Sequence, residues 1–205
     1  MDYNTLASPE IVTKTTEALS AHGVEPIIVQ NRAEALGKIK ELIPAGASVM
    51  NGSSVTLDQI GYIDYLKAGQ HGWNNLHESI VNEADPAKKS ALRKQGVLSD
   101  YYLGSVHALA STGEFVIASN TGSQLPHIVF TSPNIIFVVS TKKIVPTLND
   151  ALDRLETHVV PLEDARLMKQ ANAHTMVSKV VLFKRENQKM GRKVRMILVN
   201  EDLGF

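Results

Sequence analysis

Cysteine is absent from this 205-residue sequence. Without a thiol, the chain can form neither a disulfide nor a cysteine-ligated iron–sulfur cluster, and thiolate catalysis is excluded. The spacing of His71, His77 and Glu78 matches no compact zinc motif. We therefore expect neither a metal site nor a bound cofactor.

Long apolar runs are also missing. No run approaches the roughly 20 residues that a membrane-spanning helix needs, and residues 1–10 are polar, with no apolar signal segment. By elimination, we expect a cytoplasmic protein that makes no membrane contact.

The chain also has no net charge, because 21 basic residues balance 21 acidic ones. A general electrostatic attraction to nucleic acid is therefore not expected. The late basic cluster from Lys184 to Arg195 is interpreted as a solvated segment. Hydrophobic residues make up 43% of the chain and charged residues 20%, which is typical of an ordered globular protein.

The first third of the chain alternates helix and strand patterns. Ser8 followed by Pro9 predicts a helix over about 9–21, capped by the serine hydroxyl. Val24 opens a β-rich run, and Asn31 with Glu34 three residues later is typical of a second helix start. This alternation favours an α/β fold, with a mainly parallel central sheet flanked by helices.

The C-terminal part changes character after Pro161. Residues 177–184 and 194–199 are two β-rich runs, and Gly191 lies in the polar segment between them. This pattern predicts a C-terminal β-hairpin over about 177–200. We interpret residues 1–205 as a single domain with its core at about 24–161.

Two polar, glycine-containing stretches adjoin predicted strands and are the candidate ligand-binding segments. Ligands in open α/β sheets bind at the carboxyl ends of strands, where glycine permits close backbone approach and hydroxyls donate hydrogen bonds. The alternatives are ordinary helix capping for the first stretch and plain hairpin turns for the second. The candidate ligand-binding residues are Asn51, Gly52, Ser53, Ser54, Thr56, Ser111, Thr112, Gly113, Asn120, Thr121, Gly122 and Ser123.

Glu114 is the candidate catalytic residue, because a carboxylate can form an acyl intermediate. The alternative is a surface carboxylate. His107 and His127 lie near the same loops and are candidate acid–base groups, although a lone histidine also serves in packing.

The segment around Glu114 resembles a known family. Residues 108–116, read as Ala-Leu-Ala-Ser-Thr-Gly-Glu-Phe-Val, resemble the A-x-A-x-T-G-x-x-V stretch of LUD (lactate-utilization) domain proteins, which include lactate-utilization protein C. Residues 133–139 and Lys143-Ile144-Val145 are similar to the late strand of that family. Residues 52–57 look like its first glycine-serine loop.

The resemblance implies a NagB/RpiA/CoA-transferase-like fold, with a pocket where the two candidate loops meet. It implies a protein that binds a small anionic metabolite in lactate or related organic-acid utilization. The alternatives are an isomerase or acyl-CoA transferase-like enzyme on the same fold, and a non-catalytic subunit of a multi-protein oxidase. The expected partners are the metabolite, subunits of a lactate-oxidation complex, and further copies of this chain. We expect no specific binding of nucleic acid.

Overall fold

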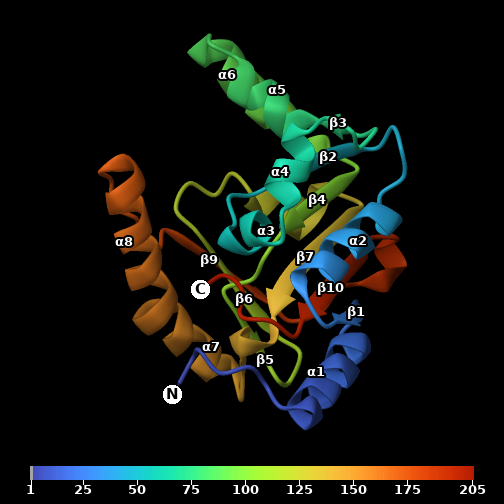
Figure 1. The fold of residues 1–205 in the computed structure, drawn as a ribbon, viewed down its shortest axis with the longest axis vertical. Coiled ribbons are helices and arrows are strands. Elements are labelled where there is room, and N and C mark those ends of the chain that lie inside the picture. Colours follow the sequence, from blue (N-terminus) through green and yellow to red (C-terminus); the bar gives the residue numbers. More distant parts are fainter. Residues whose placement is uncertain (1) are drawn as a thin grey trace.

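The structure, a computed structural model, describes residues 2–205, which form two β-sheets and their covering helices (Figure 1). The larger sheet has six strands, all parallel, in the order β1-β10-β7-β4-β2-β3. In that order the strands are Val24–Val29, Lys193–Val199, Asn134–Ser140, Tyr101–Gly104, Ser48–Asn51 and Asn74–Asn75. The predicted α/β class and mainly parallel sheet are confirmed.

The smaller sheet has four strands in the order β8-β5-β6-β9. These strands are Ile144–Val145, Ala108–Ala110, Phe115–Ser119 and Lys179–Phe183. It is mixed, because β5 pairs antiparallel with β6 but parallel with β8.

Helices account for most of the remaining chain. In chain order the α-helices are α1 (Pro9–Ala21), α2 (Arg32–Leu42), α3 (Val55–Gln59), α4 (Tyr62–Lys67), α5 (Leu76–Asn82), α6 (Pro86–Gln95), α7 (Leu148–Arg154) and α8 (Val160–Ala171). A π-helical turn at Leu155–Val159 joins α7 to α8, so the chain stays helical from 148 to 171.

The first predicted helix starts and the first strand are confirmed. Ile11 donates its backbone N–H to the Ser8 hydroxyl at 3.4 Å, and Glu34 donates its own to Asn31 Oδ1 at 3.0 Å. These side chains satisfy amide hydrogens that a helix N-terminus leaves without partners. Each helix therefore begins where the local sequence places its cap.

The two faces of the large sheet are covered differently. Helices α2, α3 and α4 pack on one face through residues such as Ile39, Leu57 and Tyr62. The other face packs against α1 and the small sheet, where Phe115 and Phe183 meet Phe137 of β7. Helix α7 covers the far side of the small sheet. The protein therefore has four layers. Helices α2, α3 and α4 form the first, the large sheet the second, the small sheet with α1 the third, and helix α7 the fourth.

The predicted C-terminal hairpin is wrong. Strand β9 pairs antiparallel with β6 in the small sheet, whereas β10 lies between β1 and β7 in the large one. The residues Met196–Val199 form an unbroken apolar run and are fully buried. Such a run is typical of a parallel strand that is covered on both faces, and a half-exposed hairpin strand would alternate.

Candidate functional site

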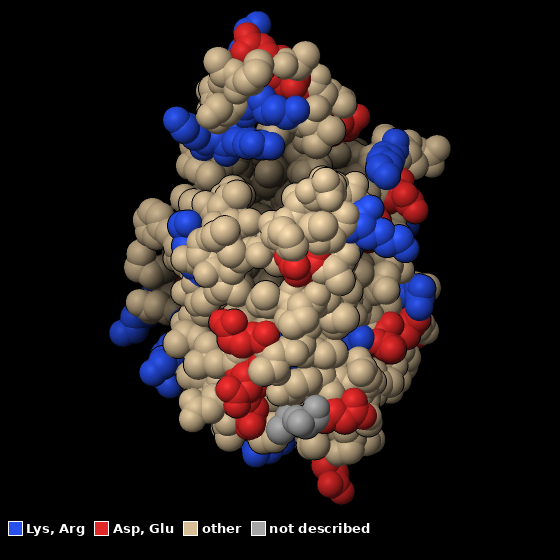
Figure 2. Space-filling view, turned by 90° about the vertical axis from the view of Figure 1, so that its left-hand side faces the viewer, with Lys and Arg blue, Asp and Glu red and all other residues tan. Residues whose placement is uncertain are grey.

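A cavity of about 720 Å³ lies at the carboxyl ends of β2, β4 and β7. The segments that follow these strands line it, and α5, α6 and α8 form its sides. Figure 2 shows the surface hollowed between the upper part of the molecule, which α5 and α6 form in Figure 1, and the body below it. The cavity therefore occupies the place where open α/β sheets bind ligands.

The first predicted loop lies at this cavity. All five of its candidate residues line the cavity: Asn51, Gly52, Ser53, Ser54 and Thr56. Asn51 is 4% exposed, and its Oδ1 atom is buried without a hydrogen-bond partner among the described residues. Ser54 instead caps α3, accepting the Leu57 N–H at 3.3 Å. Helix capping therefore accounts for Ser54, and ligand contact stays a prediction for the other residues of this stretch.

Gly52 permits a close approach, but the neighbour is another side chain of the protein. A Cβ atom at this position would lie 2.5 Å from the Tyr102 hydroxyl and 2.8 Å from Gln124 Oε1. The Tyr102 hydroxyl also donates a hydrogen bond to Gln124 Oε1 at 3.2 Å. Glycine is therefore needed here to pack the cavity wall.

The second predicted stretch divides into two parts. Asn120, Thr121 and Ser123 line the cavity. Gly122 lies among them at φ +85° and donates its N–H to the Ser119 hydroxyl at 2.9 Å. This loop follows β6 at the cavity end of the small sheet.

The structure does not bring the other part, Ser111, Thr112, Gly113 and Glu114, to the cavity lining. Strands β5 and β6 are antiparallel, so the turn that joins them lies at the opposite end of β6 from the 120–123 loop. Gly113 faces the backbone of Ala18 in α1, and the Thr112 hydroxyl donates to the Glu114 carboxylate at 2.5 Å. The pocket that the family resemblance implied is thus formed without this turn.

Glu114 has the surroundings of a surface carboxylate. Burial acts to raise its pKa, but hydrogen bonds from Thr112 and its own backbone, with the charges of His22 and Lys184, lower it on balance. Its placement outside the cavity gives no support to the nucleophile hypothesis.

Lys143 lies in the cavity wall, and the residue-by-residue prediction missed it. The residue lies three positions after the end of β7 and is 4% exposed. The Nζ atom donates to Thr56 Oγ1 at 3.2 Å, to Ser105 Oγ at 3.1 Å and to the Val106 carbonyl at 3.2 Å. It thereby joins the segments after β2, β4 and β7. Burial, then repulsion from Arg154 and Lys142, lowers the pKa of Lys143 to about 7.

Lys143 has no acidic partner. Within residues 2–205, the ion pairs do not include it. A buried cation is costly unless it is both hydrogen-bonded and paired with an opposite charge. Its three neutral acceptors supply hydrogen bonds only, so a bound anion would complete the charge balance. The signal available in the sequence was its position directly after a buried strand.

His107 lies in the cavity lining, and Arg154 is buried behind it. The His107 ring lines the cavity and accepts the Ala118 N–H at Nδ1, 3.1 Å away, which places the ring proton on Nε2. Burial, then the charges of Lys143 and Arg154, lowers the pKa of His107 to about 3, so the ring is neutral near pH 7. Arg154 is fully buried and donates to the His107 carbonyl, while its Nε and Nη2 atoms have no described partner.

His127 also lines the cavity but has a structural role. Its ring stacks on Tyr102 with centroids 4.7 Å apart, and its Nδ1 atom lies 3.0 Å from the Ser132 hydroxyl. Burial lowers the pKa of His127 to about 4. We therefore interpret it as a neutral packing residue.

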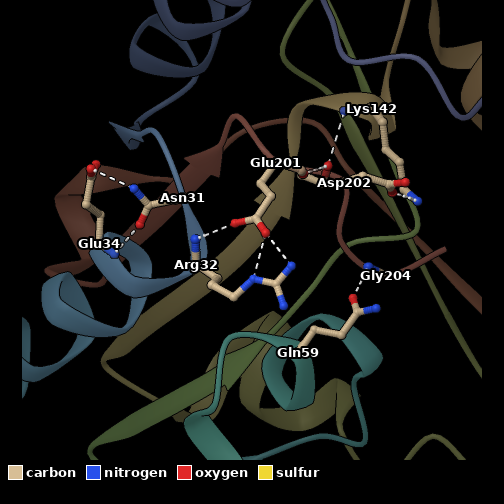
Figure 3. A network of polar contacts seen from close by, with 9 residues as sticks. Asn31, Arg32, Glu34, Gln59, Lys142, Glu201, Asp202 and Gly204 are labelled. Carbon is tan, nitrogen blue, oxygen red and sulfur yellow. Dashed lines mark hydrogen bonds and ion pairs between the residues drawn. The ribbon is translucent and has the colours of Figure 1, made fainter.

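The last residues of the chain cross the carboxyl end of the large sheet (Figure 3). Gly204 among them lies beside Lys143. Glu201 pairs with Arg32, Asp202 pairs with Lys142, and the Gly204 N–H donates to Gln59 Oε1 at 2.6 Å. A Cβ atom on Gly204 would lie 2.9 Å from Lys143 Nζ. This segment therefore shields the ammonium from solvent.

Cations outnumber carboxylates around the cavity. Among residues 2–205, its lining contains the basic side chains of Lys89, Arg93, Lys143 and Arg166 but a single acidic side chain, that of Glu163. Arg166 donates to both Glu163 oxygens, at 2.6 and 2.7 Å, which neutralises that carboxylate. The remaining charge is positive, and the cavity is suited to an anion.

In residues 2–205, no group of three or more His, Asp or Glu side chains is placed to hold a metal ion. No helix of that part of the chain is both long and apolar enough to cross a membrane.

The comparisons with known proteins agree with this architecture. The model of the LUD domain family matches residues 12–198, so the chain belongs to that family. A crystal structure of a DUF162 family protein from Deinococcus radiodurans is similar in fold, with a TM-score of 0.53 and 14% identity. The alignment covers 95% of this chain and 98% of that one. No curated protein matches this chain in sequence.

Proposed function

We propose that this LUD-family chain binds a small organic-acid anion in the cavity at the carboxyl ends of β2, β4 and β7. The observation that carries the proposal is Lys143, a buried ammonium in the cavity wall that three neutral acceptors surround and no carboxylate neutralises. The carboxylate of the ligand supplies the missing negative charge. Lactate and related acids are the chemical class that the family membership favours.

Two other residues of the cavity lining, His107 and Asn51, suit the polar groups of such a ligand. The His107 ring carries its proton on Nε2 and can donate a hydrogen bond while remaining neutral. The buried Asn51 Oδ1 atom, which has no partner among the described residues, can accept one from a ligand hydroxyl. A hydroxy acid offers both the acceptor and the donor that these side chains require.

The acyl-CoA transferase alternative has less support. The form of this alternative that uses a carboxylate nucleophile needs a free carboxylate at the cavity. Glu114 lies outside it, and Glu163 is held by Arg166. The second candidate function is a non-catalytic subunit of a lactate-oxidation complex, since the family membership favours organic-acid metabolism. Assembly with further copies of this chain and a cytoplasmic location are also part of the proposal.

Ligand-dependent thermal stabilisation tests the proposal. Lactate and glycolate should raise the melting temperature, since a ligand at about 100 times its Kd adds roughly 2.7 kcal/mol to the free energy of unfolding. The Lys143→Met variant should lose this response, whereas Lys67→Met, which removes an exposed lysine on α4, should keep it.

The melting temperature of each variant without ligand shows whether it folds. Equal responses of folded Lys143→Met and wild type would contradict the role of Lys143. Absence of any response in the wild type would favour the subunit alternative.

A further inference from the structure

The cavity is large for a three-carbon acid. Its volume of about 720 Å³ falls within the range of roughly 300–1,000 Å³ of sites for much larger ligands. Lactate has six non-hydrogen atoms and would fill only a small part of it. An anion held at Lys143 therefore leaves most of the cavity for other groups of the same ligand.

The cavity extends from Lys143 to a second group of cations. Lys143 follows β7, while α5 packs beside β2, and β4 lies between these two strands. With neighbouring strands about 4.8 Å apart, β7 and β2 are separated by roughly 10 Å. Lys89 and Arg93 of α6 line the cavity on this distant side.

The distant cations have no acidic partners. The sequence of α6 contains four basic residues and no acidic one. Lys89 Nζ donates to the Val81 carbonyl at 3.3 Å, and the ion pairs formed by residues 2–205 include neither Lys89 nor Arg93. Beside them, His77 also lines the cavity, and its Nδ1 atom is buried without a described partner. A buried polar atom without a partner indicates a missing hydrogen-bonding group.

We propose that the ligand is a doubly anionic acid, with one carboxylate at Lys143 and a second anionic group, phosphate or carboxylate, held by Lys89 and Arg93. The inference rests on the proposed function, because the first group is the organic-acid anion at Lys143. Lys and Arg form charge-assisted hydrogen bonds with either kind of anion. Val159, Val160 and Leu167 supply an apolar wall of the cavity along which the carbon chain of such a ligand can pack.

The competing explanation is that α6 simply presents a solvated basic surface. It predicts that all the basic residues of the helix behave alike. Lys88 and Lys94 lie on the same helix but outside the cavity lining. The double variant Lys88→Gln/Lys94→Gln therefore removes the same charge as Lys89→Gln/Arg93→Gln and is its matched control.

The test compares pairs of acids that differ in the second anion. Titration calorimetry measures the Kd of gluconate against 6-phosphogluconate, and of hexanoate against adipate, for the full chain. We expect the member of one pair that carries two anionic groups to bind wild type and the control variant at least tenfold more tightly than its partner. The Lys89→Gln/Arg93→Gln variant should reduce that advantage to within twofold. The pair that responds identifies the second group as phosphate or carboxylate.

The remaining outcomes separate this inference from the proposed function. Equal affinities within both pairs overturn the second anion subsite alone. The same holds if the two double variants lose the affinity advantage equally. Binding of the acids with two anionic groups that Lys143→Met leaves unchanged overturns the proposed function, and with it the placement of one carboxylate of the ligand at Lys143. If none of the four acids binds wild type, the second anion subsite is overturned, and the responses to lactate and glycolate decide the proposed function.

Discussion

The two ends of strand β6 have similar sequences and different surroundings. The turn before it, residues 111–114, and the loop after it, residues 120–123, are both short, polar and glycine-containing. The first packs against α1, and the second borders the cavity. Composition predicts a turn at both places, but only position relative to the carboxyl ends of the parallel strands decides which turn meets a ligand.

Glycine-to-alanine substitutions at the two ends of β6 should lower the stability of the protein by different amounts. Gly113 has φ +99°, and a Cβ there would lie 3.0 Å from the backbone of Ala18, so Gly113→Ala should cost about 2–4 kcal/mol. Gly122 has φ +85° and faces the flexible side chain of Lys179, so Gly122→Ala should cost about 1–2 kcal/mol. Urea unfolding measures both free energies.

Gly46→Ala is the control for backbone strain alone, because Gly46 has φ +81° with no atom within 4 Å of an added Cβ. If Gly113→Ala costs no more than Gly46→Ala, the tight packing of the turn on α1 is not important for stability.

Ligand binding in the cavity should depend on pH because Lys143 titrates near pH 7. With the pKa of Lys143 near 7, the charged fraction falls from about 0.9 at pH 6 to about 0.1 at pH 8, so affinity for an organic-acid anion should fall about tenfold. Titration calorimetry at both pH values measures it. Lys143→Arg, which stays charged, should abolish this dependence, and a pH-independent wild type would contradict the assignment.

The same pKa predicts the opposite trend in stability without ligand. The pKa of Lys143 is lower in the folded than in the unfolded chain, so between about pH 7 and 10 the unfolded chain binds more protons. Stability should therefore rise with pH in this window, relative to Lys143→Met. Thermal unfolding from pH 7 to 10 checks the sign, and a falling difference would contradict it.

The smallest effect is expected at Glu114. Glu114→Gln should change ligand affinity less than twofold, because the residue lies outside the cavity lining. Its lowered pKa means that the carboxylate contributes stability above its unfolded pKa of about 4.5, and that this contribution is lost as pH falls through the folded value. Calorimetry and acid unfolding measure the two effects, and a large loss of affinity would restore Glu114 as a site residue.

Local patterns predicted part of the candidate site because short-range rules apply there. The 51–56 loop directly follows a buried strand and precedes a helix, an arrangement that places polar residues at a strand end. Lys143 also follows a buried strand, but a lysine there is ordinarily solvated. Its burial depends on Thr56, Ser105 and the Val106 carbonyl, which are distant in sequence.

The sequence by itself determined the class of fold and the helix starts, because side-chain caps and apolar runs act within a few residues of one another. Only the tertiary structure decided the pairing of β9 and β10. Strand pairing depends on which sheet can bury an apolar run on both faces, and Met196–Val199 achieves this between β1 and β7. The same long-range packing placed the 111–114 turn on α1 and left the 120–123 loop at the cavity, a choice that no local pattern encodes.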